Sequence, residues 1–409
     1  MRIFGNIYQL NLNYLWADMN NPASLYRKSM VYLFPALALM LALFAKETSK
    51  AARDAIYLCL DVVIPSLFPF FVLSRLTVPF LRNFRCPRFL RRIFQSLTGL
   101  PYYVLPTIVL GYLSGYPTGA KLARDMLDDR LLDSEKASRV IAVANNCSPL
   151  FLIGTVGAGL FRSVRIGFIL LAVHWVSGLL AAVILNLLLK RGRFESDGRK
   201  VLFHGASTEI GTANSAAALL PGAVEDAAIL SVKVSGYIVL FSVLSELLDR
   251  IGFFSLVGGL LSSVLPGTLA GKGLEGLLRG ILEITSGSSA IALSVDTPVV
   301  AQLSMVSFIC GFAGFSVHTQ VMGIMKGTGT RYRVFLLGKF LHGTIAGILT
   351  ACLLGCLPVS LTASTVRPRI TGIPPQFRIL TVMTLIIALL VNPYENGGKN
   401  RRQEMKAPR

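Results

Sequence analysis

Four strings of small and polar residues interrupt apolar stretches of the sequence: GYLSGYPTGAK (111–121), NNCSP (145–149), EITSGSSA (283–290) and GFAGFSVHTQ (311–320). Amides, hydroxyls and free backbone groups at such breaks can bind a small polar solute. No HExxH or GxSxG motif and no carboxylate pair at a catalytic spacing accompanies them. We therefore predict a small-molecule site with no catalytic residue, no metal and no cofactor, and we expect the protein not to be an enzyme.

The first string would stop a helix, because it combines glycines with a proline. A chain that reverses there presents unpaired N–H groups at a new helix N-terminus, and these groups attract anions. Lys121, one turn later, would add a positive charge; the alternative is a packing contact of small residues, with Lys121 extended toward the membrane surface. The candidate solute-binding residues of this tip are Ser114, Gly115, Pro117, Thr118 and Lys121.

The second string places two adjacent amides and a proline within an otherwise apolar stretch. Pro149 removes a helical hydrogen bond, so nearby carbonyl groups become available as ligands. Polar groups at this depth are costly unless they line a cavity. We expect an unwound helix that faces the site; the alternative is an Asn pair that only joins neighbouring helices. The candidate ligands are Asn145, Asn146, Ser148 and Pro149.

The third and fourth strings are the counterparts of these two in the second half of the chain. The serines would form a second hairpin tip with hydroxyl donors, and the last string would supply polar groups from a matching broken span. A lone histidine such as His318 is equally often a hydrogen-bonded core residue. The candidate ligands are Ser286, Gly287, Ser288, Ser289, His318, Thr319 and Gln320.

Charged residues also fall within or at the edges of apolar stretches. An ionisable group in lipid is costly without a partner, so each of them could bind a coupling proton or sodium ion. Placement at the membrane surface or a mutual salt bridge is the commoner arrangement, and the sequence singles out no coupling residue. The charged residues concerned are Asp61, Lys233, Glu246, Glu283 and Lys339.

The composition is that of an integral membrane protein. Of 409 residues, 53% are hydrophobic and 15% are charged, and the mean hydropathy is +0.62. Soluble domains carry about 25% charged residues. Apolar stretches near the roughly 20 residues that a spanning helix needs recur along the chain. They cover residues 30–45, 55–78, 138–161, 166–189, 225–248, 299–325, 334–356 and, weakly, 379–392.

The net charge of +19 arises from basic residues in short loops, where the positive-inside rule places them. No basic face with interleaved aromatic residues is present, so we predict no nucleic-acid partner. The six cysteines show no spacing typical of a disulfide framework or a metal site.

The two halves of the chain correspond at a spacing of roughly 170 residues, as in an internal repeat. Ser74 aligns with Ser245 and His174 with His342. Hairpins that return to the side they entered leave three crossings in each half, so the two halves must be inverted. The loop 79–100 is rich in arginine and its counterpart is not, which agrees with inversion and with a cytoplasmic N-terminus.

We therefore predict an all-α polytopic membrane protein of two inverted repeats, each with a re-entrant hairpin. The predicted order is a cytoplasmic segment (1–29), a first transmembrane helix (30–49), a first repeat (50–190, hairpin 102–127), a cytoplasmic linker (191–221), a second repeat (222–356, hairpin 274–296) and a C-terminal segment with a weak last span (357–409).

The strings IPSLFPFFVLS (64–74), LGYLSGYPTGAKLA (110–123) and NNCSPLFLIGTVGAG (145–159) resemble the YlbJ family of sporulation integral membrane proteins, also called SpoVV. Members of that family contain a nucleoside-recognition or Gate domain, which is similar to concentrative nucleoside transporters. The string Gly311-Phe312-Ala313 looks like the broken-helix string of those transporters. The resemblance implies a transporter fold with paired hairpins and inverted repeats, in agreement with the loop charges.

For this family the implied activity is passage of dipicolinic acid, a small aromatic dicarboxylate, across the outer forespore membrane during spore formation. A basic Lys121 and two helix N-termini would suit such an anion. We therefore expect a multi-pass protein of the cell membrane that acts as a secondary transporter of a small polar or anionic solute. The alternatives are a transporter of nucleosides or other small solutes and a non-transporting assembly protein of the spore envelope. The sequence leaves the oligomeric state open.

Overall fold

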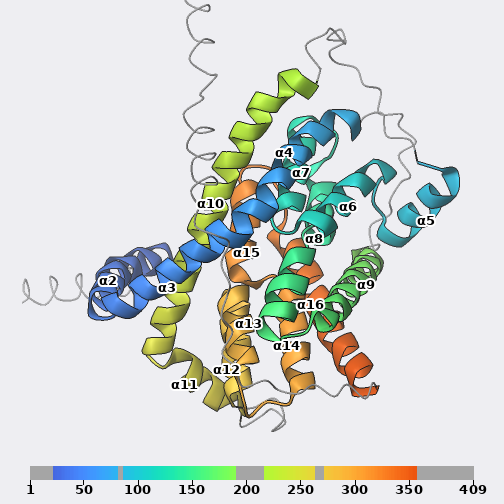
Figure 1. Ribbon diagram of the computed structural model, residues 1–409. Helices are drawn as coiled ribbons and strands as arrows, with labels where there is room; N and C mark the ends of the chain where they lie inside the picture. Colours follow the sequence, from blue (N-terminus) through green and yellow to red (C-terminus); the bar gives the residue numbers. More distant parts are fainter. Residues whose placement is uncertain (1–21, 82–85, 190–215, 263–270, 357–409) are drawn as a thin grey trace, which may run out of the picture.

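The computed structural model describes residues 22–81, 86–189, 216–262 and 271–356, and all regular elements in these ranges are helical (Figure 1). The predicted last span, 379–392, lies outside the described residues. The α-helices of the first half are α2 (Pro22–Leu43), α3 (Ala45–Leu58), α4 (Ile64–Leu81), α5 (Arg88–Thr98), α6 (Leu105–Ser114), α7 (Thr118–Asp128), α8 (Ser134–Ala144) and α9 (Val164–Leu189). Those of the second half are α10 (Ala216–Arg250), α11 (Phe253–Ser262), α12 (Lys272–Leu282), α13 (Ile284–Ala292), α14 (Val299–Phe312), α15 (Gly314–Ile324) and α16 (Tyr332–Cys356).

Several of these helices can cross a membrane. Within the described residues, four segments are long and apolar enough: Val164–Leu189, Leu219–Arg250, Val299–Ile324 and Tyr332–Cys356. Two bent helix pairs raise the number to six if each pair is one span: Ala45–Val63 with Leu67–Thr77, and Arg88–Thr98 with Tyr102–Ser114.

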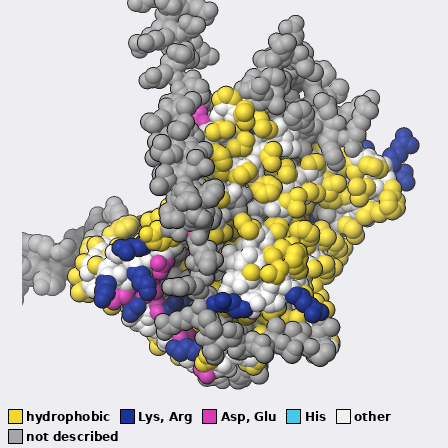
Figure 2. All heavy atoms as spheres, in the orientation of Figure 1, with side chains coloured by type: hydrophobic (Ala, Val, Ile, Leu, Met, Phe, Trp, Pro, Cys, Tyr) yellow, Lys and Arg dark blue, Asp and Glu magenta, His cyan; other side chains and the backbone are white. Residues whose placement is uncertain are grey.

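The outer surface of these helices is apolar. Leu187, Leu240 and Ile348 lie on three different spans, and each is more than half exposed. Figure 2 shows hydrophobic side chains over much of the visible described surface, with the charged side chains gathered toward its lower part and one edge. Such a surface is stable in lipid, where it does not face water. The protein is therefore an integral, multi-pass α-helical membrane protein.

The first two predicted spans are divided in the structure. A break at Phe44 separates α2 from α3, so the predicted span 30–49 is shared between two helices. The sequence explains this, because α3 begins with the polar string AKETSKAARD, which does not suit a hydrocarbon core. A π-helical turn, Cys59–Val63, then joins α3 to α4.

The first polar string forms a helical turn at the predicted position. Helix α6 ends at Ser114, because Gly115 takes a φ of 98° and Pro117 precedes the first turn of α7. Two glycines bring this turn against the end of α8. A Cβ atom on Gly111 or Gly119 would lie 1.9 Å or 2.5 Å from the carbonyl oxygen of Ala144. Only glycine fits at these two positions.

The second string interrupts a helix, as the sequence predicts. Helix α8 ends at Ala144, and Asn145 is extended, with a φ of −89° and a ψ of 108°. The chain resumes as the π-helical segment η3 (Phe151–Leu160). Pro149 accounts for the break, since proline disfavours a helical conformation in the preceding residue and cannot donate a backbone hydrogen bond.

The second hairpin turns earlier than the sequence suggests. Helices α12 and α13 meet at Glu283, which is extended and caps α13 by accepting hydrogen bonds from the N–H groups of Thr285 (2.9 Å) and Ser286 (2.7 Å). The serines predicted at the tip lie instead inside α13. Gly287 packs there against Gly280 of α12, where a Cβ atom would lie 2.1 Å from the Gly280 Cα atom.

The fourth string breaks the apolar segment Val299–Ile324. Ala313 adopts the left-handed conformation with a φ of 80° and separates α14 from α15. Helix α12 covers this break: a Cβ atom on Gly314 would lie 3.1 Å from the Gly280 carbonyl oxygen. Each helical hairpin is thus seated on one broken segment, the first on α8–η3 and the second on α14–α15.

Helix α16 packs against α8, α9 and α14. Its closest crossing is with α14, where a Cβ atom on Gly311 would lie 2.6 Å from the Gly343 Cα atom. A Cβ atom on Gly343 would lie 2.7 Å from the Phe308 carbonyl oxygen. Small residues that permit such close backbone approach are typical of helix contacts in membranes.

We predict that Gly343→Ala destabilises the protein, because the added methyl group meets backbone atoms of α14. Overpacking of this kind costs about 1–3 kcal/mol. Gly355→Ala on the same helix is the matched control, since no atom lies within 4 Å of the position that its added methyl group would take. Thermal unfolding in detergent should show a lower midpoint for Gly343→Ala alone. Equal midpoints for both variants would contradict this packing.

Candidate functional site

The amide of Asn145 joins the first hairpin to the broken helix. Its Oδ1 atom accepts a hydrogen bond from the backbone N–H of Ala120 at 3.0 Å, in the first turn of α7. Its Nδ2 atom donates to the Ile141 carbonyl oxygen at 2.7 Å. Asn145 is fully buried, and its side chain occupies the helix N-terminus that the sequence predicted as an anion site. The contact fixes the hairpin on α8.

A different set of predicted residues carries polar atoms that have no hydrogen bond. Asn146 is fully buried, and its Nδ2 atom donates to the Val143 carbonyl oxygen at 2.8 Å, whereas its Oδ1 atom has no hydrogen-bond partner among the described residues. The hydroxyl oxygens of Thr118 and Ser288 are also buried and have no hydrogen-bond partner among the described residues. Buried polar atoms without partners are rare in folded proteins, so these atoms are the best candidates for contact with a solute.

Lys121 lies in an ion-pair network. Its Nζ atom is 2.7 Å from Asp125 Oδ1 and 3.7 Å from Asp226 Oδ2. Arg75 of α4 approaches the same two carboxylates, at 3.7 Å and 3.5 Å. Two cations and two carboxylates balance one another, so Lys121 offers no uncompensated charge to an anion here. The network joins α7 to α4 and α10.

The other predicted residues of the first half are held by their own segments. Ser114 donates to the Leu110 carbonyl oxygen at 2.7 Å, and the Ser148 hydroxyl accepts from the Phe151 N–H at 3.2 Å. Gly115 lies against Ser148, since a Cβ atom on this glycine would be 2.7 Å from the Ser148 Cβ atom. Pro117 and Pro149 shape the two breaks.

The serines of α13 have three different surroundings. Ser286 lies beside Ser245 of α10, with their hydroxyl oxygens 3.4 Å apart. Gly287 fills the crossing with α12, Ser288 is fully buried and Ser289 is half-buried. Of the four predicted residues in α13, Ser288 alone has a buried polar side-chain atom without a hydrogen bond to the described residues.

The three predicted residues of α15 also lie in different surroundings. His318 is a hydrogen-bonded core residue: Nε2 donates to the Phe312 carbonyl oxygen at 2.8 Å and Nδ1 lies 3.1 Å from the Tyr332 hydroxyl. Gln320 is buried and donates to Ser316 Oγ at 3.3 Å. Thr319 is exposed and bonds to the Phe315 carbonyl oxygen on its own helix. The structure therefore does not bring Thr319 to the other candidate residues.

A cluster that the sequence did not assign to the site joins the two halves of the chain. We call Lys339, His342 and His174 the central cluster. The Lys339 Nζ atom donates to the Asn145 carbonyl oxygen at 2.6 Å and lies 3.1 Å from His342 Nδ1. His342 Nε2 lies 2.9 Å from the His174 carbonyl oxygen. The centroids of the two imidazole rings are 4.4 Å apart. All three residues are buried.

Backbone groups of the first break bond to the central cluster, and the first hairpin reaches from there to α14. The N–H of Cys147 donates to His174 Nε2 at 3.0 Å. Tyr116, in the turn of the first hairpin, donates its hydroxyl to the carbonyl oxygen of Cys310 near the end of α14. The Lys339 Nζ atom lies 5.5 Å from the centre of the Tyr116 ring. The two broken segments and the first hairpin are thus joined at one place.

The sequence held signals for this cluster. His174 and His342 align in the internal repeat, and Lys339 is one of the five charged residues in apolar stretches. Neither signal shows that the three side chains meet. Their contact depends on the crossing of α9 with α16, which no local pattern specifies.

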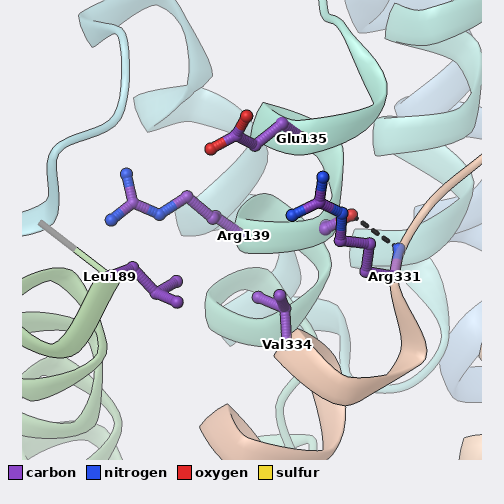
Figure 3. A pocket seen from close by; sticks show the side chains of 6 residues that line it. Glu135, Arg139, Leu189, Arg331 and Val334 are labelled. Atoms are coloured by element: carbon purple, nitrogen blue, oxygen red, sulfur yellow. Dashed lines mark hydrogen bonds between the residues drawn. The ribbon is translucent and has the colours of Figure 1, made fainter. Parts of the chain in front are cut away.

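A small cavity of about 240 Å³ opens near the other end of α8. Figure 3 shows the Glu135, Arg139 and Arg331 side chains around it, with Leu189 and Val334 below them. Arg139 is only 3% exposed and donates to Asn186 Oδ1 at 3.1 Å, and the N–H of Arg331 donates to Ser138 Oγ at 2.8 Å. Two guanidinium groups against one carboxylate make the cavity cationic, which favours an anion.

No group of three or more His, Cys, Asp or Glu side chains in the described part of the chain could hold a metal ion. The arrangement therefore consists of hydrogen-bond donors and acceptors, one buried lysine and three imidazoles. Groups of these kinds form hydrogen bonds with polar solutes.

Comparison with known proteins identifies a relative. No model of a protein family matches the chain, and no solved structure matches it. The sporulation integral membrane protein YlbJ of Bacillus subtilis (strain 168) is 29% identical over 322 residues, which cover 74% of this chain and 77% of that protein. The chain is therefore a homologue of YlbJ, as the strings at 64–74, 110–123 and 145–159 suggested.

Proposed function

We propose that this protein is a secondary transporter of a small anionic solute, built from two inverted repeats with two re-entrant hairpins in the manner of concentrative nucleoside transporters. The observation that carries the proposal is the central cluster, where broken helices from both halves of the chain meet inside the molecule. Interrupted helices at membrane depth occur where they are buried in protein or line a water-filled cavity. In transporters with inverted repeats, the substrate lies between such helices.

The arrangement of the hairpins supports the inverted repeat. Each hairpin is seated through glycines on the broken segment of its own half, as described above. His174 and His342, which align in the repeat, lie in contact with their rings 4.4 Å apart. Two equivalent residues meet in this way when an axis of pseudo-symmetry passes between them, and the substrate site of such a fold lies at the interface of the repeats.

The chemistry of the site favours an anion or a polar solute. The hydroxyl groups of Thr118 and Ser288 are buried donors without acceptors among the described residues, and the Asn146 amide has a second N–H besides the one that it donates to the Val143 carbonyl oxygen. Lys339 supplies the positive charge that the sequence prediction assigned to Lys121. Because the homologous YlbJ is named for sporulation, we propose dipicolinic acid as the substrate and the outer forespore membrane as the location, with the N-terminus in the cytoplasm.

Transport requires the enclosed residues to open to each side in turn. The ion pairs that link α7 to α4 and α10 are suited to hold one of these states, because they lie between the first hairpin and two long helices. Their carboxylates and cations can separate without loss of the hydrophobic core. A nucleoside remains the alternative substrate, and the assay below distinguishes it.

We predict that Asn146→Ala nearly abolishes saturable uptake of dipicolinate into liposomes that contain the purified protein. Asn146 Nδ2 has a second N–H besides the one that it donates to the Val143 carbonyl oxygen, and donation to a carboxylate contributes about 1.5–3 kcal/mol, so initial uptake at low concentration should fall roughly tenfold to hundredfold. Thr344→Ala is the matched control, since this exposed hydroxyl bonds to its own helix. Uridine is the comparison solute. Normal uptake by a folded Asn146→Ala protein would contradict the site, and uptake of uridine alone would contradict the substrate.

We predict that Arg331→Gln raises the half-saturation concentration for dipicolinate but leaves the maximal rate unchanged. Arg331 borders the cationic cavity at the end of α8, so it attracts the anion before it reaches the central site. An exposed charge contributes at most about 1 kcal/mol, so the shift should be roughly fivefold at most and should diminish at high salt. Arg333→Gln, an exposed arginine that does not line the cavity, is the control. Equal half-saturation concentrations for Arg331→Gln and Arg333→Gln would exclude this role of Arg331.

A further inference from the structure

Lys339 is a buried cation that has no counter-ion among the described residues. Its side chain is 0% exposed at the centre of the molecule, on the membrane-spanning helix α16. Its polar contacts are the Asn145 carbonyl oxygen at 2.6 Å and His342 Nδ1 at 3.1 Å. No aspartate or glutamate forms an ion pair with it in the part of the chain that the structure describes. An ammonium group in such surroundings is costly, and lysines of this kind mark functional sites.

The hydrogen bonds around Lys339 determine which atoms carry protons. A carbonyl oxygen can only accept, so His342 Nε2 carries a hydrogen and donates to the His174 carbonyl oxygen. His342 Nδ1 is then the acceptor for Lys339. His174 Nε2 accepts from the Cys147 N–H, so a neutral His174 carries its hydrogen on Nδ1, a buried atom without a hydrogen bond to the described residues. Both imidazoles are held in one tautomer, and Lys339 remains the group with a proton to release.

Both protonation states of Lys339 fit the same hydrogen bonds. An ammonium group has three N–H donors and a neutral amine has two, while the site provides two acceptors, Asn145 O and His342 Nδ1. The centre of the Tyr116 ring lies 5.5 Å from Nζ, and this cation–π contact favours the charged form. Loss of the proton therefore breaks neither the hydrogen bond to the Asn145 carbonyl oxygen nor the one to His342 Nδ1.

We propose that Lys339 carries the proton that is transported together with the anion. This assignment rests on the transporter proposal above and names its coupling ion. An anion bound beside the central cluster supplies the negative charge that Lys339 lacks, so it strengthens proton binding. By linkage, a protonated Lys339 strengthens anion binding to the same extent. The empty carrier returns with a neutral lysine, which avoids a buried charge, and the transport cycle becomes proton-anion symport.

Several titratable groups face Lys339 from the elements around it, and the test must separate them from the lysine. None of them is a carboxylate. They are His342 on α16, His174 on α9, Cys147 after α8, Tyr116 before α7 and His318 on α15.

The experiment uses full-length protein in liposomes, with the membrane potential held at zero by potassium and valinomycin. An acidic exterior should drive dipicolinate inward and accumulate it about tenfold per pH unit if one proton moves per anion, because a factor of ten corresponds to about 1.4 kcal/mol. A sodium gradient should have no effect. Proton entry, followed with a dye inside the liposomes, should accompany the anion in a fixed ratio.

Three variants assign the proton to Lys339. In Lys339→Gln the amide can still donate two hydrogen bonds but cannot be protonated, and in Lys339→Arg the charge is permanent. Lys339→Arg should still exchange labelled for unlabelled dipicolinate yet lose proton entry and accumulation driven by the pH gradient. Lys339→Gln should lose proton entry and accumulation as well, and it should exchange dipicolinate only at higher concentrations, because the charge that favours the anion is absent. Lys233→Gln, at an exposed lysine on α10, is the control and should behave as the wild type. Exchange without net transport distinguishes loss of coupling from loss of folding.

Three other outcomes would contradict the assignment of the proton, the coupling ion or the substrate. If a folded Lys339→Gln protein still accumulates dipicolinate with proton entry, another group carries the proton and the assignment is wrong. If the wild type accumulates dipicolinate under a sodium gradient alone, the transporter proposal stands and proton coupling falls. If the wild type moves no dipicolinate under any gradient, the proposed substrate and the coupling assignment both fall.

Discussion

Every break in a membrane helix leaves backbone N–H and carbonyl groups without partners, and in lipid only the protein or enclosed water can supply them. The rest of this structure depends on which groups form hydrogen bonds with the backbone at these breaks. Lys339 donates to the carbonyl oxygen of Asn145, and His174 accepts the N–H of Cys147. In the second half, His318 donates to the carbonyl oxygen of Phe312. Side chains that satisfy the broken helices are therefore also the polar core of the molecule.

This constraint explains why the candidate site lies where the two halves meet. The Lys339 side chain belongs to the second half and its carbonyl acceptor to the first, so the break in the first half is satisfied from the second. The hairpins close the arrangement through glycines, because a methyl group on Gly111 or Gly287 would collide with the backbone it faces. The close packing leaves a few buried hydroxyl and amide atoms unpaired among the described residues. Those atoms and the buried lysine are what a polar solute would contact.

The sequence predicted the helical membrane class and the positions of three of the four breaks, because glycine and proline act on the local backbone. It misplaced the second hairpin turn, because Glu283 caps α13 with its side chain, and a capping carboxylate resembles any other charged residue in the sequence. It assigned the positive charge of the site to Lys121, whose partners Asp125 and Asp226 become visible only in three dimensions. The roles of Lys339 and Thr319 depend on helix rotation and crossing, which hydropathy alone does not determine.

The central claim is that the enclosed cluster opens to water when a solute is carried, and Cys147 tests it most directly. This thiol is 3% exposed and follows Asn146 in the break of the first half. In protein whose other five cysteines are replaced by serine, we expect a membrane-impermeant maleimide to label Cys147 slowly in liposomes and dipicolinate to reduce the rate. If Cys147 stays unlabelled in folded protein under all solute conditions and reacts only after denaturation, the cluster is a closed structural core and the account is wrong.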